Sequence, residues 1–129
     1  MKHFILVLIC ICNFTHLFSS DNINFKHLGI KEGLSHNQVN HIFKDSHGFV
    51  WVSTASGLNR YDGYNFKVFT RDSKSTHSLK DNYVDNVQED AGGGLWVHSR
   101  AGYSYYDPQK ETFQLATTYL SEVYGIESI

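Results

Sequence analysis

The residues of this chain that could carry out chemistry are carboxylates, histidines and two tryptophans. Four aspartates recur 45 residues apart, Asp45 with Asp90 and Asp62 with Asp107, and paired carboxylates can act as general acid and base. Each of the four, however, begins or precedes a chain reversal, where an aspartate side chain accepts hydrogen bonds from the following backbone. We therefore predict structural roles for all four and no catalytic residue.

The two tryptophans, Trp51 and Trp96, could each stack on a sugar ring. They occupy the same place in two copies of a repeat, and a large aromatic residue that recurs in this way is typical of packing between repeats. We expect both to lie in the core. His98 stands where the first copy has Ser53, and such a departure is where a ligand contact could be found, although a packing role is favoured there too. The ligand-binding residues are left unassigned.

Sequence motifs for metal, phosphate and dinucleotide binding are missing from the chain. Gly92-Gly93-Gly94 precedes a strand pattern, whereas phosphate loops precede a helix. No pair of the His-x-x-x-His kind occurs, so neither a metal nor a cofactor is expected. The histidines considered are His27, His36, His41, His47, His77 and His98.

The first 20 residues have the layout of a secretory signal. Met1-Lys2-His3 supplies a positive start, and the apolar run from Phe4 to Cys12 is shorter than the roughly 20 residues of a membrane-spanning helix. We expect cleavage between Ser19 and Asp21. The alternative is an uncleaved anchor, because the positions before the cleavage site are not both small.

Composition restricts the remaining classes of function. The formal net charge is -2 and the basic residues are scattered singly, so no nucleic-acid partner is expected. Both cysteines, Cys10 and Cys12, lie in the leader, so the mature chain would have no disulfide. Aromatic residues make up 15% of the chain and there is one proline, a composition that favours strands.

An internal repeat determines the predicted architecture. Residues 34–62 align with residues 79–107 at a constant offset of 45, without a gap. A period of roughly 40–50 residues is typical of the blades of a β-propeller. The matched pairs, to which we assign structural roles, are Leu34 with Leu79, Asn37 with Asn82, Val39 with Val84, Asp45 with Asp90, Gly48 with Gly93, Trp51 with Trp96, Val52 with Val97, Gly57 with Gly102, Tyr61 with Tyr106 and Asp62 with Asp107.

Each copy predicts four short antiparallel strands separated by turns, so we assign the chain to the all-β class as two propeller blades. The strands of the first copy are expected at residues 39–44, 49–54, 58–61 and 64–69. The second strand carries apolar side chains on both faces, which is typical of a strand buried on both sides. Because propellers close with about 4–8 blades, two blades form an incomplete ring.

The segments around the two copies are also interpreted as parts of a propeller. Residues 23–28 alternate enough to form one more strand, which would complete a blade absent from this chain. The outer hairpin of the second copy, with Asp107-Pro108, is expected to be slightly longer than that of the first. The predicted organisation is a signal peptide at 1–20, a lead-in at 21–33, repeats at 34–78 and 79–119, and the first strand of a truncated third repeat at 120–129.

Three stretches of the first copy resemble the two-component regulator propeller repeat: Glu32 to Val39, Asp45 to Thr54 and Gly57 to Gly63. In that family the repeats form the periplasmic sensor region of hybrid two-component systems, upstream of a membrane helix and a histidine kinase core. The resemblance implies an exported, periplasmic sensor whose parent is anchored in the inner membrane. It also implies small glycan fragments as ligands and a homodimeric parent. The second copy departs from the pattern at His98 and Tyr103.

The sequence itself carries no kinase motif, so the chain is interpreted as a non-enzymatic fragment of such a sensor. Its partners would then be the missing blades and kinase region of a longer parent. One alternative is a fragment of a propeller enzyme, of the lyase or glycosidase type. A second alternative is a truncated remnant without function.

Overall fold

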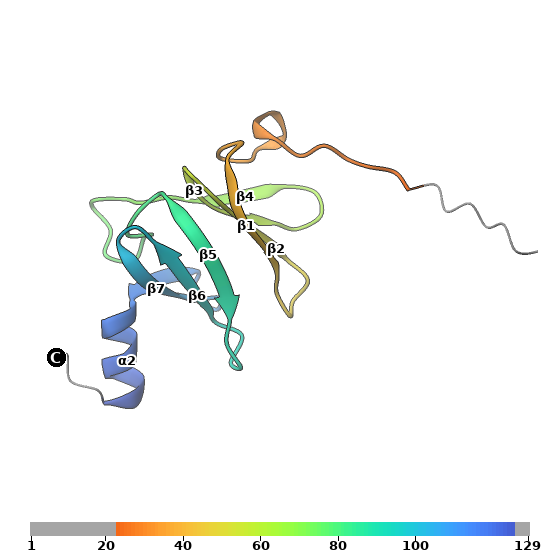
Figure 1. Cartoon of the computed structure of the whole chain (residues 1–129). Helices are drawn as coiled ribbons and strands as arrows, with labels where there is room; N and C mark the ends of the chain where they lie inside the picture. The colour runs from red at the N-terminus through yellow and green to blue at the C-terminus, as the bar shows by residue number, and fades with distance from the viewer. Residues whose placement is uncertain (1–22, 126–129) are drawn as a thin grey trace, which may run out of the picture.

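The computed structural model describes residues 23–125, which form two four-stranded antiparallel sheets (Figure 1). Each sheet has its strands in sequence order, as in a propeller blade. The predicted all-β blade architecture is confirmed. Blade 1 contains β1 (Val39–Lys44), β2 (Val50–Thr54), β3 (Gly57–Tyr61) and β4 (Phe66–Phe69), and blade 2 contains β5 (Val84–Glu89), β6 (Leu95–Ser99), β7 (Gly102–Asp107) and β8 (Thr112–Leu115).

The turns inside each blade depend on aspartate side chains and on glycine. The Asp45 carboxylate accepts hydrogen bonds from the backbone N–H of His47 at 3.0 Å and of Phe49 at 2.9 Å. Asp90 does the same in blade 2. Gly57 begins β3 with φ 128°, and a Cβ there would lie 2.6 Å from the Phe69 carbonyl oxygen. Only glycine fits that position.

The outer hairpins differ in length between the two blades. Tyr61 pairs with Phe66 in blade 1, whereas its equivalent Tyr106 pairs with Phe113 in blade 2. The hairpin of blade 2 is therefore two residues longer, as the sequence predicted. Glu111 lies in the added turn with φ 53°.

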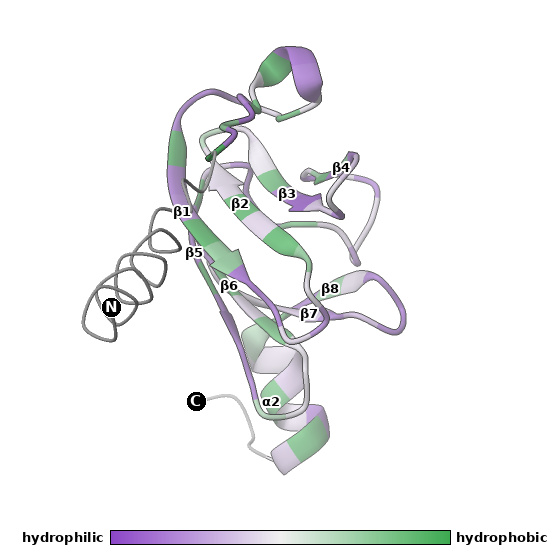
Figure 2. Cartoon of the chain, turned by 90° about the vertical axis from the view of Figure 1, so that its right-hand side faces the viewer, coloured by the Kyte–Doolittle hydropathy of each residue, from purple (hydrophilic) through white to green (hydrophobic). Residues whose placement is uncertain are grey.

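The core lies between the two blades, where β1 and β2 contact β5. One face of blade 1 packs there against the opposite face of blade 2. Figure 2 shows the two sheets turned by 90° from the view of Figure 1 and coloured by hydropathy. Burying a large apolar side chain contributes roughly 1.5–3 kcal/mol, so this junction makes a large contribution to stability. The buried residues are Trp51, Leu58, Leu79, Val84, Val87, Leu95, Val97, Tyr106 and Phe113.

The repeated asparagines, Asn37 and Asn82, lie outside this core. Both side chains are exposed, just before β1 and β5 respectively. The Asn82 side-chain oxygen accepts a hydrogen bond from the backbone N–H of Arg71 at 2.6 Å, which ties the connection between the blades to the start of blade 2. Asn37 lies beside the lead-in of blade 1, since a Cβ on Gly29 would be 3.5 Å from its side-chain oxygen. These two matched residues therefore contact the segment that enters their blade and are not part of the packing between blades.

Two segments outside the blades differ from the sequence predictions. Residues 23–28 contain no strand, and Figure 1 shows them running away from blade 1. Ile23 and Phe25 are 74% and 92% exposed, and none of the strands between residues 23 and 125 pairs with them. Ile30–Glu32 forms a short 3-10 helix, η1, before blade 1.

The second difference is at the C-terminal side of blade 2. Helix α2 (Ala116–Tyr124) follows β8 directly, so the expected first strand of a third repeat at residues 120–129 is wrong for residues 120–124. In the part of the chain that the structure describes, no strand lies beside these residues to complete a ladder, and a helix satisfies their backbone hydrogen bonds locally. Gly125 ends α2 in the left-handed conformation, with φ 63°.

The predicted signal peptide and the last part of the predicted third repeat, residues 126–129, lie outside the described residues. Within residues 23–125, no helix is long and apolar enough to cross a membrane.

Candidate functional site

The junction between the blades is built around Trp51 of β2, and we call it the seam. The Trp51 indole N–H donates to the Asp45 carboxylate at 2.7 Å in a buried hydrogen bond. The Trp51 ring meets the Tyr106 ring edge-on, with centroids 5.2 Å apart, and stacks on Phe69 at 5.7 Å. Trp51 is 2% exposed, so the predicted core position is confirmed for this tryptophan. Asp45 therefore holds both the turn and the indole.

Arg60 of β3 lies beside Trp51 in the seam and joins the two blades. Its guanidinium donates to the Tyr106 hydroxyl at 3.3 Å and pairs with the Glu111 carboxylate at 2.9 Å. It also lies over the Phe49 ring, 4.6 Å from the ring centroid. Arg60 thus makes a cation–π contact within blade 1 and polar contacts with blade 2.

The environment of the seam changes the acidity of two groups. Burial raises the pKa of Tyr106 to about 12. Hydrogen bonding from Lys67, together with Arg60, lowers the pKa of Glu111 below its usual 4.5. Tyr106 therefore remains a neutral donor and acceptor, while Glu111 stays ionised as the partner of two cations.

A cavity of about 230 Å³ opens at the end of the seam where the turns of both blades meet. We call it the seam cavity. Blade 1 contributes aromatic and polar side chains from β2, β3 and the β1–β2 turn, and blade 2 contributes two of its turns and Tyr106. The lining residues are Asp45, His47, Phe49, Trp51, Arg60, Gly92, Gly93, Leu95, Tyr106, Pro108 and Gln109.

In blade 2 the equivalent tryptophan has a different environment. Trp96 is only half-buried, so the prediction that both tryptophans lie in the core is wrong for Trp96. Blade 2 packs over Trp51, whereas within residues 23–125 no further blade packs over Trp96. The neighbours of Trp96 are Tyr105 at 5.2 Å and Tyr119 of α2 at 5.5 Å, both edge-on.

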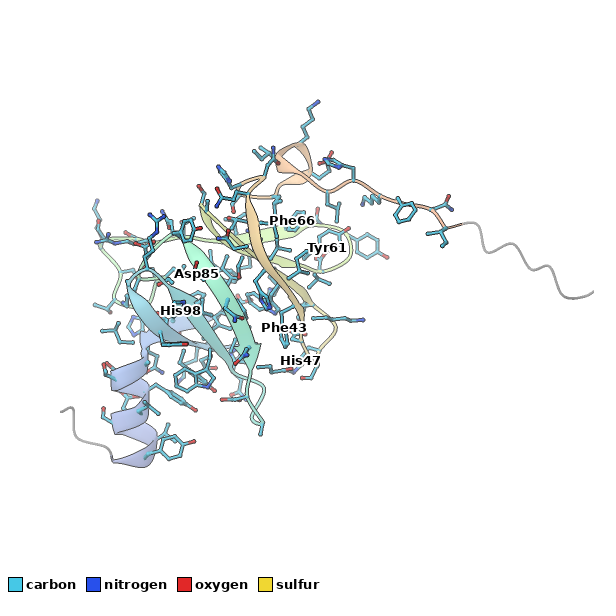
Figure 3. All side chains as sticks on the ribbon, viewed as in Figure 1. Phe43, His47, Tyr61, Phe66, Asp85 and His98 are labelled. Atoms are coloured by element: carbon cyan, nitrogen blue, oxygen red, sulfur yellow. The ribbon has the colours of Figure 1, made fainter. Side chains whose placement is uncertain are left out.

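A second hollow of about 150 Å³ lies on this open face of blade 2, between Asn86, Gln88, Trp96, His98 and Tyr103. The His98 imidazole lies 3.2 Å from the Asp85 carboxylate, and Figure 3 shows the two side chains facing each other from β6 and β5. His98, which the sequence marked as a departure from the repeat, is thus in this hollow and not in the seam.

The sequence analysis missed two neighbouring positions at which both residues differ between blade 1 and blade 2. Phe49 and Arg60 of blade 1 correspond to Gly94 and Tyr105 of blade 2, because Trp51 pairs with Arg60 and Trp96 pairs with Tyr105 in the sheets. Tyr105 occupies the space that Phe49 fills in blade 1, since a Cβ on Gly94 would lie 1.8 Å from the Tyr105 hydroxyl. The sequence could have revealed this pair, because both positions differ between the two copies when these are aligned at the offset of 45.

The outward face of blade 1 is apolar and forms a third hollow of about 170 Å³. Seven of its eight lining residues are the repeat equivalents of residues that the seam buries in blade 2. Blade 1 therefore has the surface that receives another blade. The lining residues are Leu28, Leu34, Val39, Ile42, Val50, Val52, Tyr61 and Phe66.

The four aspartates considered for acid–base chemistry do not come together. Asp62 and Asp107 accept backbone hydrogen bonds in the outer hairpins, at Tyr64 and Asn65 and at Gln109 and Lys110 respectively. Among residues 23–125, no group of three or more histidine, aspartate or glutamate side chains could hold a metal ion.

Two such sheets, packed face to face through a repeated tryptophan position, define the class of the protein: they are blades of a β-propeller. Residues 33–56 match the family model described as "Two component regulator propeller". This part of blade 1 is thus similar to a two-component regulator propeller repeat.

Known proteins of this kind are similar to the chain over part of their length. Histidine kinase P4 of Formosa agariphila is 35% identical over 60 residues, which is 46% of this chain and 4% of the relative. The extracellular domain of BT3049 from B. thetaiotaomicron, described as a putative hybrid two component system, is 34% identical with a TM-score of 0.64. It matches over 70% of this chain and 13% of that one.

A second structural neighbour is the extracellular domain of BT4673 from the same organism, also described as a putative hybrid two component system. It is 25% identical with a TM-score of 0.58, over 73% of this chain and 14% of that chain. Both structural neighbours are extracellular domains. The chain spans about one seventh of their length or less, so it corresponds to a small part of such a domain.

Proposed function

We propose that this chain forms part of the ligand-sensing propeller of a hybrid two-component histidine kinase, exported to the periplasm, with glycan fragments as the signal. The observation that carries the proposal is the seam. Trp51 of one blade is buried against Tyr106 of the next, in a fold that matches the extracellular domain of BT3049 at 34% identity. In this role the chain supplies binding surface, and phosphotransfer belongs to other regions of a longer parent in the inner membrane.

Two carboxylates of the outer hairpins, Asp62 and Asp107, do not have the acidity of a general acid. Hydrogen bonds from the backbone N–H groups of Asn65 and Tyr64 lower the pKa of Asp62. Burial acts to raise the pKa of Asp107, but the backbone N–H groups of Gln109 and Lys110 and the Lys110 ammonium group together lower it. A general acid needs a raised pKa, near the working pH. Both groups are therefore poor candidates for the acid of a lyase or glycosidase.

The glycan part of the proposal is supported by the side chains around the two hollows. Aromatic residues line both hollows together with amide and imidazole groups, and the seam cavity also has the Arg60 guanidinium. Pockets that combine apolar walls with a few convergent polar groups are typical of small-ligand sites. A homodimer of the parent is a further part of the proposal, since paired kinase regions would transmit the signal.

The experiment that tests the proposed function is made in cells of the source organism. An antibody against residues 23–125 identifies the native protein, and the culture is then given a panel of oligosaccharides. A membrane-associated protein much heavier than 14.8 kDa, whose phosphorylation changes with one oligosaccharide, supports the sensor. A product of that mass without any response favours the remnant, and degradation of an oligosaccharide by the purified protein favours the propeller enzyme.

A further inference from the structure

The outward face of blade 1 carries the side chains that a neighbouring sheet would bury. Its apolar residues are the repeat equivalents of residues that are at most 2% exposed in the seam, yet Val39 and Ile42 are 40% and 63% exposed. In Figure 3, Tyr61 and Phe66 lie on the side of blade 1 away from Asp85 of blade 2. The equivalent pairs are Leu34 with Leu79, Val39 with Val84, Ile42 with Val87, Val50 with Leu95, Val52 with Val97, Tyr61 with Tyr106 and Phe66 with Phe113. A sheet fits this face, and polar groups decide which sheet.

Two polar contacts across the seam show how such a sheet is held. The Asn40 side-chain amide donates to the Val84 carbonyl oxygen at 2.7 Å. Ser46 donates to the Glu89 carboxylate from its backbone N–H at 2.9 Å and from its hydroxyl at 2.5 Å. In both contacts the donor lies in blade 1 and the acceptor in blade 2. The sheet that docks therefore brings donors, and the face that receives it brings acceptors.

On the outward face of blade 1 one of these acceptors is replaced by a cation. Lys44 stands at the repeat position of Glu89. It pairs with Val50 between β1 and β2, and directly paired residues present their side chains on the same face, so Lys44 lies beside the third hollow. Its side chain is exposed and makes no ion pair among residues 23–125. Because an ammonium group has only donors, the docking sheet needs an acceptor where blade 1 has Ser46.

A second copy of the chain does not supply this acceptor. Its blade 2 would dock head to tail and would bring Ala91 to the place of Ser46. It would also bring Asp85 to the place of Asn40, so that a carboxylate would face a carbonyl oxygen without a donor between them. Both polar contacts of the seam would therefore be lost between two copies.

Helix α2 also obstructs the docking of a second copy. In the seam, Tyr106 of the following blade meets Trp51 edge-on at 5.2 Å. On the open face of blade 2, Tyr119 of α2 already meets Trp96 edge-on at 5.5 Å. The tyrosine of an incoming blade would have to displace it. The occupant of the outward face of blade 1 is therefore a sheet of another sequence.

We propose that the outward face of blade 1 is covered by a sheet of different sequence from the same longer parent, selected by a carboxylate in the turn after its first strand that pairs with Lys44. The parent as the source of the sheet rests on the proposed function, and it is supported by the match to only 13% of the BT3049 domain. An exposed ion pair contributes little affinity, but it discriminates between partners. Lys44 is in this way a residue that determines which sheet packs on blade 1.

Cross-linking of the native protein with a carbodiimide tests the proposal, because this reagent joins an amine directly to a carboxylate in contact with it. Peptide mass spectrometry then identifies the two segments. We expect Lys44 to be joined to an aspartate or glutamate outside residues 1–129. The ion pair between Lys67 and Glu111 is the internal positive control. The Lys44→Arg variant keeps the charge without the reactive amine, so it should lose the Lys44 cross-link and keep the control.

The outcomes of the cross-linking experiment are separated by mixing unlabelled and ¹⁵N-labelled protein. A cross-link within one isotopic form supports a sheet from the same chain. A cross-link between the two forms, or one from Lys44 to a carboxylate within residues 23–125, overturns the proposal. It is also overturned if Lys67 is joined to Glu111 while Lys44 is joined to nothing.

The oligomeric state of the mature chain tests the exclusion of a second copy. Sedimentation velocity across a dilution series should show a monomer of constant mass. Ile42→Lys places a charge on the outward face, and Tyr64→Lys is the matched control, since Tyr64 is 85% exposed on the outer hairpin. Self-association of the wild type that Ile42→Lys abolishes and Tyr64→Lys preserves would show that a second copy docks on this face, against the proposal.

Failure of the docking surface and failure of the proposed function give different results. If the native protein responds to an oligosaccharide but Lys44 forms no cross-link, the docking sheet is wrong and the sensor stands. If Lys44 is joined to a later segment of a protein that no oligosaccharide affects, the docking sheet stands and glycan sensing fails.

Discussion

Replacing Gly94 by alanine tests whether Tyr105 of blade 2 fills the space that Phe49 fills in blade 1. The first repeat has Phe49 at this position, so comparison of the copies alone predicts that a side chain is tolerated. The structure predicts the opposite, since a Cβ on Gly94 would lie 1.8 Å from the Tyr105 hydroxyl oxygen and 2.2 Å from its Cζ. The Tyr105 ring must leave its place.

The magnitude follows from the contacts that Tyr105 would lose. Its ring stacks on Tyr119 with centroids 3.6 Å apart and meets Trp96 edge-on at 5.2 Å. Aromatic pairs contribute about 0.5–1.5 kcal/mol each, and overpacking costs about 1–3 kcal/mol. Gly94→Ala should therefore lower the free energy of unfolding by about 2–4 kcal/mol. This value already allows for the smaller stabilisation that alanine gives by making the unfolded chain less flexible. For a domain of this size the Tm should fall by about 10–20 °C.

Urea denaturation followed by tryptophan fluorescence measures the effect, with Gly92→Ala as the matched control. Gly92 lies in the same turn, and the nearest atom to its Cβ would be 3.3 Å away. In a Tyr105→Ala background the Gly94→Ala penalty should nearly vanish, whereas Tyr105→Phe should not relieve it because Cζ remains. If Gly94→Ala is no more destabilising than Gly92→Ala, the packing of Tyr105 described above is wrong.

Three further predictions concern single polar groups. Asp45→Ala should cost about 2–4 kcal/mol and Asp90→Ala about 1–2 kcal/mol in urea denaturation, because only Asp45 also accepts the buried indole N–H; equal costs would contradict this. Ser53→Ala should raise the free energy of unfolding by about 1 kcal/mol, since the buried Ser53 hydroxyl has no partner within the described residues; destabilisation would show that the hydroxyl is satisfied. The lowered pKa of Glu111 means that its ion pairs stabilise the fold above pH 4.5 and are lost as the pH falls through the lower folded value. Glu111→Gln should therefore lose less stability than the wild type between about pH 5 and pH 3, and parallel pH profiles would refute this.

The blades could be predicted from sequence because their signals are local or periodic. The strand expected at residues 39–44 coincides with β1, since the Asp45-to-Gly48 turn fixes its end. The longer outer hairpin of blade 2 followed from a two-residue shift of Phe113 relative to Phe66. These features depend on the order of residues along one strand and its turn.

The candidate site could not be predicted in the same way, because it depends on which strands lie side by side. Arg60 reaches Tyr106 and Glu111 across the seam, and no local pattern marks such a contact. Whether residues 23–28 and 116–124 form strands depends on neighbouring strands as well, and none pairs with them among the described residues. A strand needs a partner for its backbone groups, whereas a helix such as α2 satisfies them alone.

The contact between Tyr119 and Trp96 has a consequence for how such a chain emerges from the ribosome. The Tyr119 ring meets Trp96 at 5.5 Å and 81°, close to the 5.2 Å and 67° at which Tyr106 of blade 2 meets Trp51. A helical turn thus reproduces the aromatic contact that a neighbouring blade provides. During synthesis each blade is complete before the next one exists, and exposed apolar surface at that stage promotes aggregation. A newly made blade whose tryptophan is partly covered by the residues just behind it exposes less apolar surface while its neighbour is being made.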